Sequence, residues 1–188
     1  MTEEFEMKMP LSEEEYFFLI KLFQEHICSE NVQINYYYDT RTREFRRQNT
    51  TVRIRQKGGR FKGTVKKHLP QRSCSIERSF FVSGLSPSFE LEEKRVYLQG
   101  ELKTHRIKIP ITDFAVMMID KNEYLGQTDH ELELEYSELK EGEAMSMMLL
   151  IEKLLGHKRK SRADISKSER FFRRLEITEH GDLSEERE

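Results

Sequence analysis

The sequence predicts an α+β protein in which eight antiparallel strands close into a barrel and helices pack against its outside. Eight short runs rich in β-branched and aromatic residues are separated by turns. Stretches with apolar residues at helical spacing lie near both ends of the chain. Several strands carry charged residues at alternate positions, so one face of each is charged and the other apolar. Eight strands are enough to close a barrel, and helices over the apolar faces would leave the charged faces inside.

The chain begins with a strand and a helix. Residues 1–9 are expected to form the strand, which Pro10 ends because proline cannot donate a hydrogen bond to a neighbouring strand. Ser12 and Glu15 have the spacing of a capping box, and the helix that they begin is predicted to run to about residue 27. Its apolar residues recur every three or four positions, which indicates a helix packed on a core.

Seven further strands are expected in the middle of the chain. Gly58-Gly59 predicts a hairpin turn between two of them, and Gly126 lies in the turn between the last two. Residues 41–49 are expected to form a loop, and residues 86–93 a loop or a short helical turn. The predicted strands are residues 32–39, 51–57, 60–68, 75–82, 97–111 (one strand, or two broken near Gly100), 115–121 and 130–136.

The end of the chain is predicted to be helical again. One helix covers residues 143–155 with Gly156 as its C-cap, and Asp164 is expected to cap a last helix that ends at residue 175. Since no repeat or linker divides the chain, we expect a single domain of residues 1–178. Residues 179–188 are acidic and poor in apolar side chains, so we expect a flexible tail there.

The composition limits the classes of function. The chain has 188 residues, long enough for one domain with a substantial core. Charged residues make up 35% of it, but the net charge is only -2, so a generally basic surface that attracts nucleic acid is not expected. The charges are segregated, with a basic region at residues 41–67 and an acidic region at 129–143. Two cysteines without metal-binding spacing, and no long apolar run, predict a cytoplasmic protein without a membrane segment.

Two strands carry rows of carboxylates. The N-terminal strand places Glu4, Glu6 and Lys8 on one face. Three glutamates share one face of the strand at residues 130–136: Glu131, Glu133 and Glu135. Carboxylates held close together repel one another unless a cation lies between them, and a hard divalent cation prefers such oxygen ligands.

Basic rows complement the acidic ones. Arg53 and Arg55 share a face of one strand, and Lys62, Thr64 and Lys66 share a face of the next. For any single strand, charges facing solvent on an open sheet would explain such a row. Inside a closed barrel the rows need partners, because unpaired buried charges are destabilising. A polyphosphate with magnesium would satisfy the acidic and basic rows together.

These rows resemble the motifs of a known family. Glu4-x-Glu6-x-Lys8 resembles the signature of the CYTH superfamily, also called triphosphate tunnel metalloenzymes, and the match extends along nearly the whole chain. Each motif is weak alone, but the ordered set is specific. The other segments that carry the resemblance are Arg53-x-Arg55, Thr64-x-Lys66, Lys103-Thr104-His105-Arg106, Ile119-Asp120 followed by Tyr124-Leu125-Gly126, Glu131-Leu132-Glu133-Leu134-Glu135 and Lys167-x-x-Arg170-Phe171.

The resemblance implies a barrel around a hydrophilic tunnel, in a chain similar to the small bacterial members. It implies Mg²⁺ or Mn²⁺ as cofactor and a triphosphate as substrate: inorganic triphosphate, thiamine triphosphate or an RNA 5′-triphosphate end. The implied metal ligands are Glu4, Glu6, Glu131, Glu133, Glu135 and Asp120, with Glu131 and Glu133 favoured over Glu135 on their strand. The implied substrate-binding residues are Lys8, Arg53, Arg55, Lys62, Lys66, Arg106 and Lys167, and all except Lys62 are also candidate catalytic residues.

The function expected from the sequence is metal-dependent hydrolysis of a triphosphate, with inorganic triphosphate as the leading substrate. An adenylate cyclase of the same fold is an alternative, although the sequence offers no clear adenine pocket. A non-catalytic module that binds polyphosphate or a nucleotide is another, but it would not need so many carboxylates. Binding of RNA 5′-triphosphate ends is supported only by the basic residues 41–47.

Overall fold

The fold is an antiparallel barrel, seen in a computed structural model that describes residues 2–69, 74–156 and 165–185. The strands are β1 (Thr2–Leu11), β2 (Ser29–Asp39), β3 (Thr50–Lys57), β4 (Arg60–Leu69), β5 (Cys74–Phe80), β6 (Ser88–Leu91), β7 (Lys94–Pro110), β8 (Ala115–Tyr124) and β9 (Gln127–Tyr136). The helices are α1 (Glu13–Leu22), α2 (Glu44–Arg47), α3 (Glu141–Leu154) and α4 (Lys167–Glu185), with short 3₁₀ turns η1 (Gln24–His26) and η2 (Glu138–Lys140).

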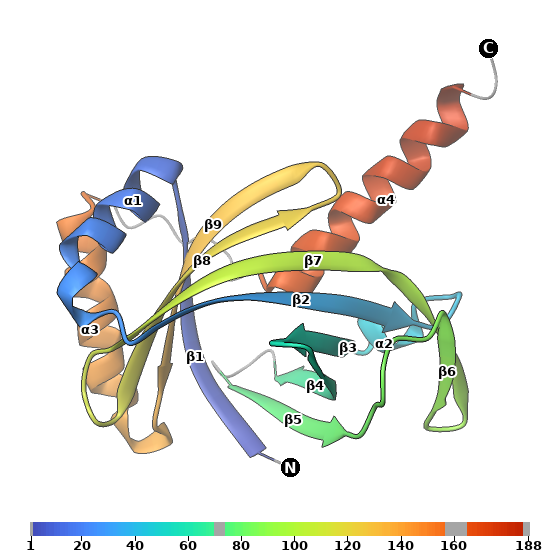
Figure 1. Ribbon diagram of the computed structural model, residues 1–188, viewed down its shortest axis with the longest axis horizontal. Coiled ribbons are helices and arrows are strands. Elements are labelled where there is room, and N and C mark those ends of the chain that lie inside the picture. Colours follow the sequence, from blue (N-terminus) through green and yellow to red (C-terminus); the bar gives the residue numbers. More distant parts are fainter. Residues whose placement is uncertain (1, 70–73, 157–164, 186–188) are drawn as a thin grey trace.

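Eight of these strands close the barrel (Figure 1). They follow the order β2-β3-β4-β5-β1-β9-β8-β7, and β7 pairs back with β2. All the pairings are antiparallel, and β6 pairs only with the first residues of β7. The closed eight-stranded barrel predicted from the sequence is therefore confirmed.

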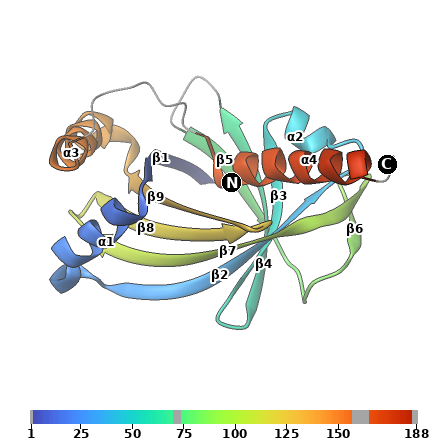
Figure 2. The same ribbon diagram turned by 90° about the horizontal axis from the view of Figure 1, so that it is seen from above.

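Helices pack on the outside of the barrel (Figures 1 and 2). The predicted capping box of α1 is present, because Ser12 and Glu15 each accept a hydrogen bond from the other's backbone N–H. Helices α1 and α3 lie at one end of the barrel, and α4 lies on another side. Among the described residues, no helix combines the length and the apolar character needed to cross a bilayer.

The main core lies between the barrel wall and these helices. On β9 the apolar Leu132 and Leu134 are fully buried in a cluster that also takes in Leu19 of α1 and Met148 of α3. The glutamates that alternate with them on β9 point to the other side of the wall. The apolar faces of the strands thus face outward toward the helices, and the charged faces line the interior.

Several elements differ from the sequence-based expectation. Strand β1 continues through Pro10 to Leu11, and α1 ends at Leu22 rather than near residue 27. The expected loop at residues 41–49 contains the short helix α2, because the Asp39 carboxylate accepts hydrogen bonds from the backbone N–H groups of Thr40, Phe45 and Arg46. Residues expected to form a loop or helical turn contain β6, a short strand that exists only through its pairing with β7. Helix α4 passes the predicted end at residue 175 and continues to Glu185.

Strand β7 is one continuous strand that carries an irregularity near Gly100. The register with β2 shifts between Tyr37 and Tyr38 at this point. Gly100 has a φ of 148°, and a Cβ there would lie 2.8 Å from the ring of Phe171 in α4. A glycine is therefore required where the helix approaches the strand closely.

Candidate active site

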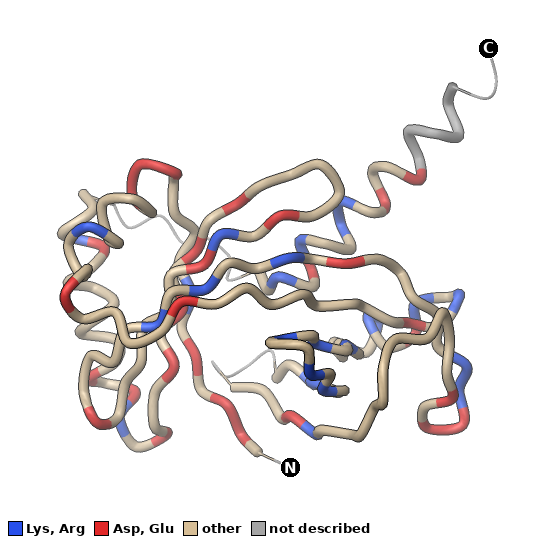
Figure 3. The backbone as a smooth tube through the Cα atoms, viewed as in Figure 1, with Lys and Arg blue, Asp and Glu red and all other residues tan. Residues whose placement is uncertain are grey.

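The inner faces of the barrel strands converge on a narrow polar cavity, which we call the tunnel. Its volume is about 60 Å³. Both acidic and basic positions lie along the strands of the barrel wall (Figure 3). The residues lining the tunnel are Glu4, Glu6, Lys8, Tyr37, Thr51, Arg53, Arg55, Lys66, His68, Arg106, Glu133, Glu135, Ser166, Lys167 and Ser168. Most of the residues that the sequence nominated are thus brought together.

The two glutamates of β1 are paired with lysines. Lys66 Nζ lies 2.6 Å from a carboxylate oxygen of Glu4 and 2.8 Å from one of Glu6. Lys8 Nζ lies 2.9 Å from the same oxygen of Glu6. Although burial acts to raise the pKa of Glu6, Lys8 and Lys66 hold it well below its usual range. Glu6 therefore stays ionised and able to accept a metal ion.

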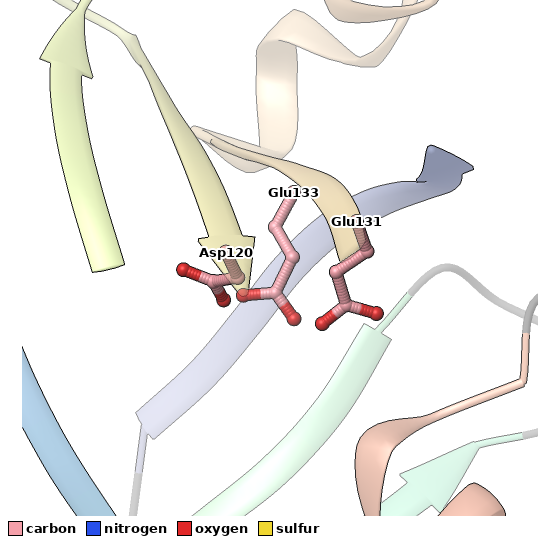
Figure 4. A group of neighbouring side chains, drawn as sticks. All are labelled: Asp120, Glu131 and Glu133. Atoms are coloured by element: carbon pink, nitrogen blue, oxygen red, sulfur yellow. The ribbon is translucent and has the colours of Figure 1, made fainter. Parts of the chain in front are cut away.

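A second acidic group lies on β8 and β9. Asp120, Glu131 and Glu133 are buried and point toward one another, with ligand oxygens within 4.8 Å (Figure 4). Lys167, at the start of α4, contacts all three carboxylates. Arg106 binds Asp120 through two hydrogen bonds of 2.8 and 2.5 Å and also contacts Glu133. Glu133 faces the tunnel, whereas Asp120 and Glu131 lie behind its lining residues.

Among the acids that line the tunnel, Glu135 has the least positive charge near its carboxylate. Burial, and then the charge of Glu4, raise its pKa to about 7, with only partial relief from Arg106. No ion pair within 4.0 Å links Glu135 to a described cation. A divalent cation between Glu135 and its acidic neighbours would remove this repulsion, so the residues present fit a metal site.

Glu135→Gln is expected to raise the free energy of unfolding by about 1–3 kcal/mol at pH 8 in the presence of chelator. The pKa of Glu135 is near 4.5 when unfolded and about 7 when folded. Stability that depends on its proton is complete below pH 4.5 and is lost as the pH rises through 7. Urea unfolding from pH 5 to 8 would measure this. The exposed Glu3→Gln is the control, and an equal pH response of Glu135→Gln and wild type would contradict the prediction.

The opposite wall of the tunnel is built from arginines. Arg55 Nε donates a 2.9 Å hydrogen bond to Oδ1 of Asn35, and among the described residues no carboxylate lies within 4.0 Å of its guanidinium. Burial, and then the charges of Arg53 and Arg106, lower the pKa of Arg55 to about 9. This side of the tunnel therefore attracts an anion.

Two residues lie at the edge of this arrangement. Lys62 shares the inward face of β4 with Lys66, but its side chain is 61% exposed and does not line the tunnel. Glu77 of β5 lies 3.4 Å from Arg53 and 3.7 Å from Lys62. The side chain of Glu77 therefore points to the inward side of the wall, although it does not line the tunnel.

One end of the tunnel opens into a large groove of about 1330 Å³. The tunnel and the groove share Glu6, Lys8, Thr51, His68, Ser166 and Ser168 as lining residues. The far wall of the groove includes arginines of the 41–47 segment. Arg46 of this segment contacts Glu169 and Glu176 of α4, so its charge is largely neutralised.

Sequence reasoning missed several residues of the interior. Asn35, Thr51 and His68 were not proposed for the site, although each shares the inward parity of a proposed neighbour or lies on a strand beside one. Extending the alternation from Arg53 to Thr51, and from Lys66 to His68, would have found two of them. Asn35 gives no such signal, because an uncharged amide looks the same on either face.

Comparisons with known proteins agree with this architecture. The family model of the CYTH domain matches residues 2–166. A protein from Bacillus halodurans, named as a candidate adenylate cyclase, has a similar structure with a TM-score of 0.72 and 24% identity, over 92% of this chain and 100% of that one. No match was found among curated proteins.

Two further structures are similar in fold at lower identity. One is from Hippeastrum, a candidate adenylyl cyclase described as having a dominant triphosphatase activity, with a TM-score of 0.69 and 15% identity over 89% of this chain and 94% of that one. The other is the Mimivirus capping enzyme triphosphatase, with a TM-score of 0.59 and 9% identity over 83% of this chain and 90% of that one. From the family model and the closed, charged barrel together, we conclude that this chain belongs to the CYTH domain family.

Proposed function

We propose that the protein is a divalent-metal-dependent triphosphatase that hydrolyses inorganic triphosphate inside the tunnel. One observation carries this proposal: the closed interior contains both an acid and a guanidinium whose charges are not balanced by their neighbours. Glu135 is a half-buried acid with too little positive charge around it, and Arg55 is a half-buried guanidinium without a described carboxylate partner. A metal ion alone would satisfy the first and a phosphate alone the second, whereas a metal triphosphate satisfies both.

The acidic side of the tunnel would hold the metal, either Mg²⁺ or Mn²⁺. The ligands proposed are Glu4, Glu6, Glu133 and Glu135, with Asp120 and Glu131 as further candidates. Bound there, the metal would supply charge neutralisation and a water molecule of lowered pKa.

The basic residues would bind and orient the substrate. Arg53, Arg55 and Arg106 are proposed to donate hydrogen bonds to phosphate oxygens, because the guanidinium fork matches their geometry. Lysines now paired with carboxylates would exchange these partners for phosphate as the substrate enters: Lys8, Lys66 and Lys167. Phosphoryl transfer asks mainly for positioning and charge stabilisation, which such a site supplies. Lys62, which does not line the tunnel, would contact the substrate from the outer edge of the barrel.

Inorganic triphosphate is proposed rather than an organic one because of the lining of the tunnel. Charged and hydroxyl groups dominate it, and Tyr37 carries the one benzene-type ring among the described lining residues. That ring is fully buried against Phe171, with a centroid distance of 4.9 Å, so it is not free to stack on a base. The neutralisation of Arg46 by α4 likewise disfavours an RNA-binding role for residues 41–47.

The proposal is tested by phosphate release from inorganic triphosphate, ATP and thiamine triphosphate with Mg²⁺, with Mn²⁺ and with chelator. We expect release from inorganic triphosphate that chelator abolishes and that added metal restores. Cyclic AMP formation from ATP is measured in the same reactions. Metal-dependent binding of triphosphate without any release would overturn the hydrolase proposal in favour of a binding module, and cyclic AMP as the main product would favour a cyclase.

A further inference from the structure

His68 lies where the tunnel meets the groove. It is on β4, two residues after Lys66, and so shares the inward face of that strand. Its side chain lines both the tunnel and the groove. A substrate that enters from the groove therefore passes His68 before it reaches the charged interior.

Hydroxyl groups connect His68 to α4. The Nε2 atom lies 3.5 Å from Oγ1 of Thr51, which lies 2.8 Å from Oγ of Ser168, which in turn lies 3.0 Å from Oγ of Ser166. The opening of the tunnel into the groove, which we call the mouth, is thus bordered by neutral hydrogen-bonding groups from β3, β4 and α4. No described carboxylate pairs with the His68 ring.

Cations surround the imidazole. Burial, and then the charges of Lys66 and Lys8, lower the pKa of His68 to about 4; Glu6 opposes this shift, and Arg53 adds a smaller lowering effect. On the side of β5 its backbone neighbour is Ser75, which carries no charge. His68 is therefore neutral at neutral pH, first because it is buried and second because the nearby lysines and arginine repel its proton.

A triphosphate would reverse this balance. It would bring several negative charges among Lys66, Lys8 and Arg53, so the repulsion that now acts on His68 would fall and a direct attraction would appear. We propose that His68 is a substrate-contacting residue that takes up a proton from solvent as a triphosphate enters the tunnel and then donates a hydrogen bond to its outermost phosphate. This inference rests on the proposed triphosphate substrate.

The charge of His68 would then depend on whether substrate is bound. Without substrate, the neutral ring adds no repulsion to a tunnel already rich in cations. With substrate, the imidazolium adds one charge-assisted hydrogen bond at the entrance. The proton that His68 takes up comes from the buffer.

The first test follows the histidine ring signals by NMR in the intact protein. Spectra are titrated with pH in the presence of Mg²⁺, with and without a non-hydrolysable imido analogue of inorganic triphosphate. We expect the pKa of His68 to rise by about two units or more when the analogue binds. The exposed His26 is the internal control and should not move. An analogue that binds without moving the pKa of His68 would overturn the inference.

The second test compares His68→Asn with wild type in steady-state hydrolysis of inorganic triphosphate from pH 6 to 9. We expect KM to rise about tenfold at pH 6 and to approach the wild-type value at pH 9, with kcat changed less. A merely structural role would shift KM equally at all pH values, and that outcome counts against the proposal. Failure of the wild-type protein to hydrolyse triphosphate would refute the proposed activity, while the NMR titration would still decide the role of His68.

Discussion

Arg55→Met is expected to reduce kcat/KM for triphosphate hydrolysis by about 10²–10³-fold while leaving the protein at least as stable as the wild type. Arg55 lies on the arginine wall of the tunnel, where its guanidinium is held by Asn35 and is close to Arg53 and Arg106. Removal of the guanidinium would take away hydrogen-bond donors that already point toward the proposed phosphate site. Methionine keeps the length of the stem and its packing.

The stability result distinguishes this variant from an ordinary buried substitution. The pKa of Arg55 is lowered to about 9 because the folded protein disfavours its charge. Loss of that charge should therefore raise the free energy of unfolding, by on the order of 1 kcal/mol. The same arginine would then be unfavourable for folding and necessary for binding the substrate.

The measurement pairs initial rates with urea unfolding in chelator. Arg60→Met is the matched control, because Arg60 is exposed at the adjoining hairpin and should change neither quantity appreciably. Near-normal kcat/KM in Arg55→Met would remove Arg55 from the substrate site. A large loss of stability would show that the arginine has a structural partner in solution.

Asp120→Asn is expected to lower the free energy of unfolding by about 3–5 kcal/mol. Asp120 is completely buried and contacts both Arg106 and Lys167, the latter at 2.8 Å. Burial already lowers the pKa of Lys167, which Asp120 opposes. Neutralising Asp120 would leave two buried cations with less compensation.

Urea unfolding at pH 7 measures this loss. Glu123→Gln is the control on the same strand, because Glu123 forms a half-exposed pair with Lys103 and should change stability by no more than about 0.5 kcal/mol. Equal effects of the two substitutions would contradict the role assigned to the buried cluster. Activity should fall in Asp120→Asn as well, since Arg106 would lose the carboxylate that orients it.

The strands of the barrel could be predicted because their alternation is strong and local. The rows at Glu4 and Glu6, and at Arg53 and Arg55, also fixed which face would be charged. Helix α2 could not be predicted in this way, because it depends on the Asp39 carboxylate as a cap. Strand β6 likewise depends on a partner strand rather than on its own propensity.

The sequence could indicate which residues form the site, but not which of these side chains contact one another. Glu131, Glu133 and Glu135 share one face, so alternation treats them alike. Their environments differ only after closure, when Lys167 reaches Glu131 and Glu133 while no described cation forms an ion pair within 4.0 Å of Glu135. The preference for Glu131 over Glu135, which the resemblance implies, stays a prediction, and the proposal of Glu135 as a ligand rests on its place in the tunnel lining. Glu133 and Glu135 are the two that line the tunnel.

The closure of the barrel has a consequence for how the chain is made. The first strand pairs with the last, so that Lys8 meets Glu133, and Lys167 follows later still. On the ribosome, β1 must wait for most of the domain to emerge before it gains β9 as a neighbour. Such non-local pairing slows folding. The acidic cluster gains its lysine last of all, so a nascent chain that stops before α4 would contain carboxylates without their counter-charge and should be a preferred target for chaperones.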